Sequence, residues 1–257
     1  MRIYPFFSSS SGNCTYIGDR EHGLLIDCGV SYTRVKNALE KAQIPMTAVR
    51  AVLITHEHSD HIYGLKMLTK KTAIPVYARR ATLDYLANKG CILSEAHDIE
   101  EETEIDGFHI TAIPTMHDAV SPCAYRIERD GKNCAVCTDL GTVTSPVEEA
   151  LRGVRTILLE ANYDCDMLIH GLYPYELKER ISSYDGHLSN TQSAEFAVYL
   201  VKNGTEQIIS GHLSQNNNTP GCAREEITQT LLKNGLEEGK DYMYKAAEPE
   251  NDFYFNW

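Results

Sequence analysis

Long hydrophobic runs are scarce in this sequence. No stretch of its 257 residues approaches the ~20 consecutive apolar residues of a membrane-spanning helix. The apolar run at residues 3–7 is too short for a signal peptide. We therefore expect a cytoplasmic chain without a membrane segment, in which the eight cysteines stay reduced. The motif Cys134-x-x-Cys137 has no second copy, and its spacing within a strand directs the two side chains to opposite faces, which argues against a metal or redox pair.

Positive charge is also scarce. Lysine and arginine number 24 against 36 aspartates and glutamates, which gives a net charge of −12. Nucleic-acid-binding proteins are usually basic, so this charge weighs against a polynucleotide substrate. The distribution softens that objection, because residues 95–106 hold seven acids whereas residues 61–83 hold none. The acid-free stretch carries five bases, Lys66, Lys70, Lys71, Arg79 and Arg80. It is either a solvated face or a local basic surface.

The pattern of apolar residues predicts an α/β protein of short strands and helices. We expect strands over residues 3–7, 15–17, 24–27, 51–54, 75–77, 108–113, 124–128, 132–137, 156–159, 207–210 and 242–244. We expect helices over residues 31–43, 61–68, 79–88, 146–151, 174–182, 191–202 and 224–233. Because no repeat, linker or low-complexity segment interrupts the pattern, we expect a single domain over residues 1–257.

The most informative motif is His56-x-His58-x-Asp60-His61, which follows the apolar run at residues 51–54. Residues two apart in an extended chain point the same way, so His56 and His58 can bind one ion together. Asp60 and His61 begin the next helix and can face a second ion. Imidazole nitrogens combined with a carboxylate suit zinc, manganese or iron. A chance cluster explains four ligand-type residues in six positions poorly, so the motif predicts a metal site.

Three further candidate ligands also come directly after predicted strands: His117, Asp139 and His212. Side chains in such positions can meet along one rim of a sheet. We therefore expect them to complete a site for two divalent metal ions, Zn²⁺ or Mn²⁺, with Fe as a further option. We expect no organic cofactor.

In this order along nearly the whole chain, the residues resemble the pattern of the metallo-β-lactamase superfamily. The resemblance implies an αββα sandwich, with two mixed sheets flanked by helices. The ligands that it implies are His56, His58 and His117 for one ion, and Asp60, His61 and His212 for the other. Asp139 would bridge the two ions. Asp27, which ends an early strand, would hold the histidine loop by hydrogen bonds without binding metal.

Two branches of the superfamily resemble this chain less well. The secreted β-lactamases have arginine at the position of His61, cysteine at the position of Asp139, and a signal peptide. The flavodiiron branch has glutamate at the position of His58 and carries a flavin domain. The remaining branches hydrolyse either thioesters and lactones or phosphodiesters.

The segment Gly186-His187-Leu188-Ser189-Asn190 favours the phosphodiester branch. It resembles the Gly-His-Ser-Thr segment of the tRNA-processing RNase Z branch, which also precedes a helix and the last ligand histidine. The serine-rich turn at residues 8–13 and the motif His212-Leu213-Ser214 further resemble the bacterial YycJ (WalJ) group. Members of that group are described as 5′-to-3′ exonucleases on double-stranded DNA, and often have glycine where this chain has Ser9. The chain between Asp139 and His212 is too short for a β-CASP insertion.

The resulting hypothesis is metal-assisted hydrolysis of a phosphodiester at a DNA end. A metal-bridging hydroxide is the expected nucleophile, and Asp60 and His187 are the expected catalytic residues, with His187 as the general acid for the leaving oxygen. The candidates for binding substrate are Arg180, Ser189, Asn190, Ser214 and Asn216. Lys178 is an alternative to Arg180 for offsetting negative charge.

Two other interpretations stay open. The acidic net charge favours a small-molecule hydrolase of thioesters, lactones or cyclic phosphodiesters. A non-catalytic regulator that keeps the fold as a metal or ligand sensor is the third possibility. The complete ligand set argues against this third possibility, because degenerate members of such families usually lose ligands.

Overall fold

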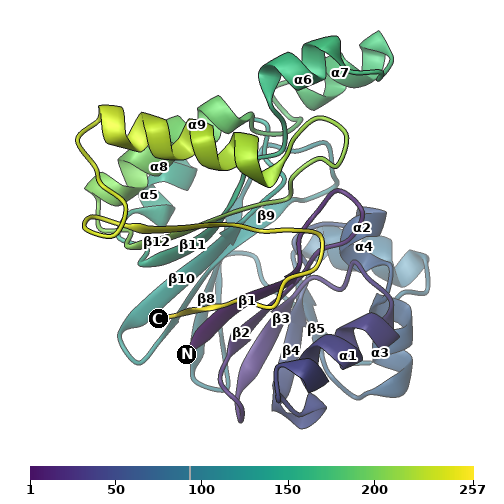
Figure 1. The fold of residues 1–257 in the computed structure, drawn as a ribbon. Helices are drawn as coiled ribbons and strands as arrows, with labels where there is room; N and C mark the ends of the chain where they lie inside the picture. Colours follow the sequence, from purple (N-terminus) through teal and green to yellow (C-terminus); the bar gives the residue numbers. More distant parts are fainter. Residues whose placement is uncertain (93) are drawn as a thin grey trace.

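The computed structural model describes residues 1–92 and 94–257. These residues form four layers, because two sheets pack face to face and helices cover both outer surfaces (Figure 1). The predicted αββα sandwich is therefore confirmed.

The first sheet has seven strands in the order β14-β1-β2-β3-β4-β5-β6. Their bounds are β1 Arg2–Phe7, β2 Cys14–Gly18, β3 Gly23–Ile26, β4 Val49–Leu53, β5 Val76–Ala78, β6 Ala96–Asp98 and β14 Phe255–Asn256. The strands from β14 to β3 pair antiparallel, and those from β3 to β6 pair parallel. The sheet is therefore mixed.

The second sheet is also mixed and runs in the order β13-β12-β11-β10-β9-β8-β7. Its strands are β7 Glu102–Ile105, β8 Phe108–Pro114, β9 Cys123–Arg129, β10 Lys132–Cys137, β11 Thr156–Glu160, β12 Gln207–Gly211 and β13 Met243–Ala246. The strands from β13 to β10 are parallel, and those from β10 to β7 are antiparallel.

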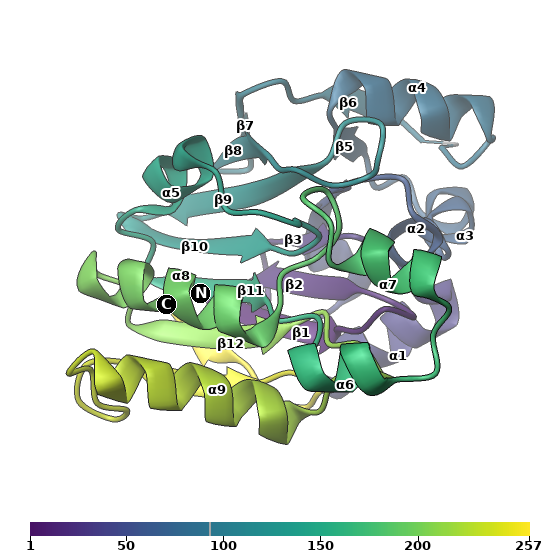
Figure 2. The same ribbon diagram turned by 90° about the horizontal axis from the view of Figure 1, so that it is seen from above.

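The helices complete the outer layers. Their bounds are α1 Tyr32–Lys41, α2 Ser59–Ile62, α3 Leu65–Lys71, α4 Arg80–Asn88, α5 Ser145–Leu151, α6 Cys165–His170, α7 Tyr175–Ile181, α8 Asn190–Lys202 and α9 Pro220–Lys233, with a short 3-10 turn at Met46–Ala48. Helices α6 and α7 stand apart from the layers, at the same end of the molecule as α2 (Figures 1 and 2).

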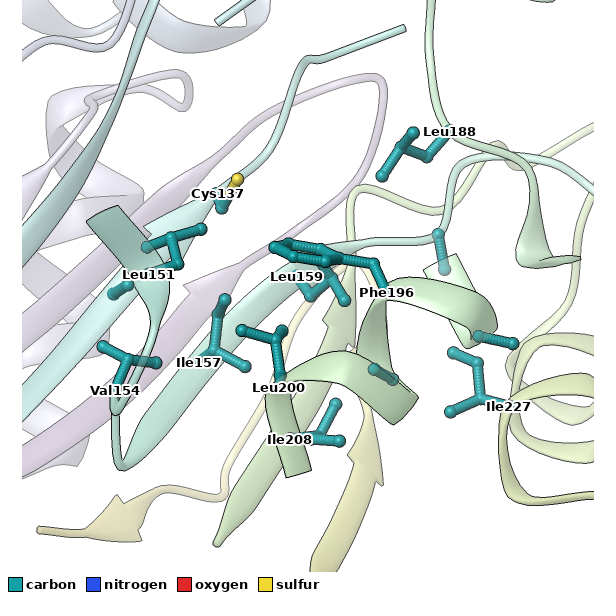
Figure 3. Packing of buried hydrophobic residues seen from close by; sticks show 14 of the residues in the cluster. Cys137, Leu151, Val154, Ile157, Leu159, Leu188, Phe196, Leu200, Ile208 and Ile227 are labelled. Carbon is teal, nitrogen blue, oxygen red and sulfur yellow. The ribbon is translucent and has the colours of Figure 1, made fainter. Parts of the chain in front are cut away.

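Three apolar clusters lie between the four layers. One joins α1, α3 and α4 to the first sheet. A second fills the space between the two sheets. The third joins α5, α8 and α9 to the second sheet, where Ile157 and Leu159 of β11 pack against Phe196 and Leu200 of α8 (Figure 3). Alternation along the central strands supplies two of these clusters at once, because successive side chains point to opposite faces.

Strand β10 illustrates this alternation. Cys134 lies in the cluster between the sheets, whereas Cys137 lies in the outer cluster under α8. Both thiols are buried, and none of the cysteines in the described residues forms a disulfide. The expectation that the Cys134-x-x-Cys137 pair points to opposite faces is confirmed.

The predicted helix over residues 61–68 is wrong in its extent, because the chain forms two shorter helices, α2 and α3. They are separated at Gly64, whose amide donates a 2.8 Å hydrogen bond to the carbonyl of Cys28. A Cβ at Gly64 would lie 2.0 Å from the carbonyl oxygen of Val30, so only glycine allows this close approach. The apolar pattern also did not predict β6, β7, β14 or α6. Across residues 1–92 and 94–257, no helix combines the length and apolar character that crossing a membrane requires.

Candidate metal centre

The predicted ligands gather where strands of both sheets end. His56 follows β4 in the first sheet, and His117, Asp139 and His212 follow β8, β10 and β12 in the second. Strands β10 and β12 each pair parallel with β11, and β8 runs in the same direction as β10 because two antiparallel steps separate them. The carboxyl ends of these strands therefore meet at one edge of the sandwich.

Three site residues turn the chain at these strand ends with a left-handed backbone. Asp27, Asp139 and His212 have φ angles of 62°, 61° and 54°. Non-glycine residues seldom adopt such angles, and they concentrate at functional sites where the surrounding structure fixes them. Ser9, in the serine-rich turn, does not have a positive φ. Its departure from the glycine often found there is therefore sterically harmless.

One group of donors consists of His56, His58 and His117, whose ligand atoms lie within 4.8 Å of one another. Nδ1 of His58 lies 3.3 Å from Nε2 of His117. The ring centroid of His56 lies 4.6 Å from that of His58 and 5.0 Å from that of His117. Nε2 of His56 is buried without a hydrogen-bond partner. This is the set that the resemblance implies for one ion.

The second group consists of Asp60, His61 and His212. Oδ2 of Asp60 lies 3.5 Å from Nε2 of His61 and 3.4 Å from Nε2 of His212. Asp139 lies between the groups, because its Oδ2 is 3.3 Å from Nε2 of His61 and its Oδ1 is 3.7 Å from Nε2 of His117. Asp139 is thus placed as a bridging carboxylate would be.

These spacings fit a divalent metal ion. Donor atoms about 2.0–2.1 Å from one tetrahedral ion lie about 3.3–3.4 Å from each other, which is the spacing found in both groups. Among the candidate ligands, Nε2 of His56 and Oδ2 of Asp139 are buried without a hydrogen-bond partner in the described residues. Buried polar atoms are nearly always satisfied, so a bound ion accounts for this pair.

Asp27 holds the histidine loop, as the resemblance implies. Its Oδ2 lies 2.7 Å from Nδ1 of His61, and its Oδ1 accepts a 2.9 Å hydrogen bond from the amide of Thr55. The hydroxyl of Thr55 in turn lies 3.0 Å from Nδ1 of His56. Outer contacts of this kind fix the ring orientation, so that Nε2 faces the ion.

Glu160, the last residue of β11, is a functional residue that the sequence analysis missed. Its carboxylate is fully buried, and Oε1 lies 2.8 Å from Nδ1 of both His187 and His212. Oε2 accepts hydrogen bonds from the amides of Leu140 and Leu188, at 3.0 and 3.2 Å. One carboxylate thus orients a ligand histidine and the candidate general acid together. Its position in the sequence could have indicated its role. Glu160 is the last residue of an apolar strand, and Asp27 and Asp139 follow such strands within one or two residues.

The charge states suit metal binding. Burial lowers the pKa of His56 well below its ordinary value, and the neighbouring histidines lower it further. Burial alone would also lower the pKa of His212, but the carboxylates of Asp139, Asp60 and Glu160 outweigh it and raise that pKa to about 10. Without an ion, His212 therefore carries a proton at neutral pH, and a divalent cation would take the place of that positive charge.

Arg180 lies beside the first group of donors. Its Nε donates to Oδ2 of Asp118 at 2.5 Å, and Oδ1 of Asp118 lies 3.4 Å from Nε2 of His117. Lys178 instead donates a 2.7 Å hydrogen bond to the carbonyl of Ile169 in α6. Of the two cations considered for offsetting charge, Arg180 is the one near the metal centre.

The neutral candidates for substrate contact differ in accessibility. Ser189 is buried and caps α8 through a capping box. Asn190 is buried and paired with the side chain of Asn218, and Ser214 is buried and accepts from the amide of Asn217. Asn216 is exposed and donates to the hydroxyl of Tyr173. The three buried side chains thus stabilise the loops that carry His187 and His212. This role is different from the direct contact with substrate that was predicted for them.

The basic stretch at residues 61–83 is partly neutralised. Arg79 pairs with Glu100 at 3.5 Å, and Arg80 pairs with Asp84 at 3.1 Å. Glu100 belongs to the acidic segment at residues 95–106, which therefore folds back beside these arginines. The free charge of the stretch is smaller than its composition indicates.

Comparison with known proteins agrees with this geometry. Residues 22–212 match the family model described as the beta-lactamase superfamily domain. The chain is 31% identical over 247 residues to the exodeoxyribonuclease YycJ of Bacillus anthracis, which covers 95% of this chain and 94% of that protein. It is 34% identical over 249 residues to the exodeoxyribonuclease WalJ of Streptococcus pneumoniae, which covers 95% and 93%. Among solved structures, the metallo-β-lactamase fold protein YhfI of Bacillus subtilis superposes with a TM-score of 0.73 at 16% identity, over 99% of this chain and 98% of that one.

Proposed function

Since this chain belongs to the metallo-β-lactamase superfamily as a metal-dependent hydrolase, we propose that it cleaves phosphodiester bonds, and that it acts as a 5′-to-3′ exonuclease on DNA. The observation that carries the proposal is the similarity, over 95% of the chain, to two relatives named exodeoxyribonucleases. We further propose one cytoplasmic domain over residues 1–257, without a β-CASP insertion and without an organic cofactor.

The proposed cofactor is a pair of divalent metal ions, Zn²⁺ or Mn²⁺, with Fe as a further option. The ligands would be His56, His58 and His117 for one ion, and Asp60, His61 and His212 for the other, with Asp139 between them. Bound there, the ions would lower the pKa of a coordinated water towards ~7 and offset negative charge on the phosphate.

The protein residues divide the remaining work. Glu160 holds Nδ1 of His187, so Nε2 of His187 is free to give a proton to the leaving oxygen as general acid. Oδ2 of Asp60 lies 3.4 Å from Nε2 of His212, so the two would hold the same ion, which is the catalytic role of Asp60 in this proposal. Arg180, which donates to Asp118 next to His117, would offset charge on a phosphate oxygen.

The net charge of −12 repels DNA at long range. Salt at ~0.15 M screens charges beyond about 8 Å, so local contacts decide binding. With Arg79 and Arg80 already paired to acids, few bases are free for phosphates. We therefore expect weak binding that depends on a small number of phosphate contacts.

Duplex DNA labelled at one end tests the proposal. The purified chain should shorten it in Mn²⁺ or Zn²⁺, and a 5′-phosphate should speed the reaction relative to a 5′-hydroxyl. If DNA stays intact at every metal tried while a thioester, a lactone or a cyclic phosphodiester is hydrolysed, the small-molecule interpretation takes its place. If no substrate of any class is hydrolysed by the metal-loaded chain, the regulator interpretation takes its place.

Elemental analysis tests the number of ions. Reconstituted protein should approach two ions per chain, and Asp139→Ala should lose one of them together with most activity, because it removes the carboxylate between the two groups. A wild-type chain that never holds more than one ion would contradict the bridging role of Asp139.

A further inference from the structure

A cleft of about 420 Å³ adjoins the metal centre on the side of Asp60. Its lining includes the carboxylate-bearing Asp60 itself, four serines and one arginine: Ser10, Ser11, Ser31, Ser59 and Arg34. The volume falls within the range of small-molecule sites, about 300–1,000 Å³. Because Asp60 belongs to both, a substrate bound at the metal ions can extend into the cleft.

The serine-rich turn is fixed to both metal-binding loops. The amide of Asn13 donates to the carbonyl of Asp60 at 2.8 Å, and the hydroxyl of Ser8 accepts from the amide of His212 at 2.9 Å. Side-chain Nε2 of Gln215 donates to the hydroxyl of Ser11 at 2.9 Å. The hydroxyls of this turn therefore keep a set distance from the metal centre.

Several donors in the cleft are available to a ligand. Ser10 and Ser59 are exposed, and their hydroxyls make no hydrogen bond within the described part of the chain. The side chain of Arg34 is 49% exposed, and its ion pair with Glu250 is long at 3.4 Å. Ser31 caps α1, whose first turn contains no acid, so the positive end of that helix adds to the charge of Arg34.

We propose that this cleft binds the terminal 5′-phosphate of the substrate strand, one nucleotide away from the phosphodiester that is cleaved. The proposal rests on the proposed function. A phosphate is an anion with several acceptor oxygens, and the cleft offers one guanidinium and neutral hydroxyl donors that match it. The single acid in the lining, Asp60, is a metal ligand whose charge is offset when the ions are bound. A cleft of this size next to the ions holds one nucleotide, which explains an enzyme that starts at chain ends.

The test compares short DNA strands that carry a 5′-phosphate or a 5′-hydroxyl. The measured quantity is the ratio of kcat/KM for the two ends. For the wild type it should be tenfold or more, since a charge-assisted hydrogen bond corresponds to about tenfold or more in affinity. Arg34→Gln should bring the ratio close to one by lowering kcat/KM on the 5′-phosphate strand.

Glu250→Gln is the matched control, because it breaks the same ion pair while keeping Arg34. It should retain or increase the ratio. The double variant Ser10→Ala/Ser59→Ala removes two unpartnered hydroxyls and should lower the ratio severalfold, which provides a second test in case loss of the contact between Arg34 and the ring of Phe7 impairs folding. Arg34→Gln should also reduce the slope of log KM against log salt by about 0.7–0.9, as expected for one lost phosphate contact.

The outcomes separate the two proposals. Two results would overturn the phosphate site and leave the nuclease activity standing. In the first, the wild type cleaves DNA with no preference for a 5′-phosphate. In the second, the Arg34→Gln and Ser10→Ala/Ser59→Ala proteins fold and keep the wild-type ratio. A wild type that cleaves no DNA overturns the proposed function and the phosphate site together.

Discussion

Replacing Glu160 by glutamine should disable the metal centre while leaving the fold intact. Glutamine has the same shape as glutamate, so the substitution changes only which atoms can accept a hydrogen bond. Oε2 of Glu160 faces two backbone N–H donors, of Leu140 and Leu188, and Oε1 faces Nδ1 of His187 and His212. The glutamine NH₂ group must take one of these two places.

The backbone donors cannot change, so the glutamine oxygen stays with them and its NH₂ group faces the two imidazoles. Each ring must then accept at Nδ1, which moves its proton to Nε2. A protonated Nε2 on His212 cannot bind metal, and His187 loses the carboxylate at Nδ1 that supports the imidazolium from which a general acid donates its proton. Changes in such outer contacts cost about 10–100-fold in metal affinity or activity, and here two rings change at once.

The expected result is a loss of at least about 100-fold in kcat, together with a 10–100-fold weaker affinity for one of the two ions. Metal titration followed by elemental analysis measures the affinity, and circular dichroism checks that the fold is kept. Glu57→Gln is the matched control: this buried glutamate accepts from the amide of Val120 but has no hydrogen bond to a ligand ring. A Glu160→Gln protein with two ions and a kcat within about threefold of the wild type would refute the tautomer argument.

Three other predictions follow from the same contacts. His187→Ala should keep both ions while kcat falls by roughly 10²–10⁴-fold, as for loss of a general acid; loss of an ion in that variant would show that His187 is a ligand. Metal binding should release protons and strengthen as pH rises, because nearby carboxylates outweigh burial and raise the pKa of His212 to about 10, so this ring is protonated in the ion-free site at neutral pH. Calorimetry in buffers of different ionisation enthalpy measures this release, and its absence at pH 7 would contradict the assignment. A thiol reagent at pH 8 should modify the exposed Cys165 and the partly buried Cys91 and Cys222. It should leave the five buried thiols, Cys14, Cys28, Cys123, Cys134 and Cys137, unmodified until denaturant is added, because burial shields them and raises their pKa values.

The apolar runs, such as those of β4 and β12, were sufficient to predict an α/β protein. The rule that side chains after strand ends meet at one edge then predicted the grouping of the ligand-type residues. The four-layered sandwich was predicted only from the resemblance to the metallo-β-lactamase superfamily. Glu160 was missed because the strand before it was predicted to stop at residue 159, which left the glutamate outside any motif. Its role becomes visible only when His187 and His212, which are far apart in the chain, lie on either side of it.

Pairings between distant segments account for the other differences. Arg79 is neutralised by Glu100, and no local pattern indicates that the acidic segment returns to it. Ser189 and Asn190 form part of a recognisable motif, but the same residues also cap α8 and pair with Asn218, and a motif cannot distinguish these uses. Strands β6 and β7 carry acids and few apolar residues, so no apolar pattern predicts them. They form at the sheet edges by pairing with β5 and β8.

The division of the ligands between the two sheets has a mechanical consequence. His58 and His117, 59 residues apart, come from loops of different sheets, and so do Asp60 and His212, 152 residues apart. An ion bound to either group would therefore connect the first sheet to the second and close a long loop of the chain, as a covalent cross-link does. A ligand that binds only the folded chain adds about 2.7 kcal/mol of stability at 100 times its Kd. Chelation should thus lower the Tm as well as the activity. The proposed ions would therefore contribute to thermal stability as well as to catalysis.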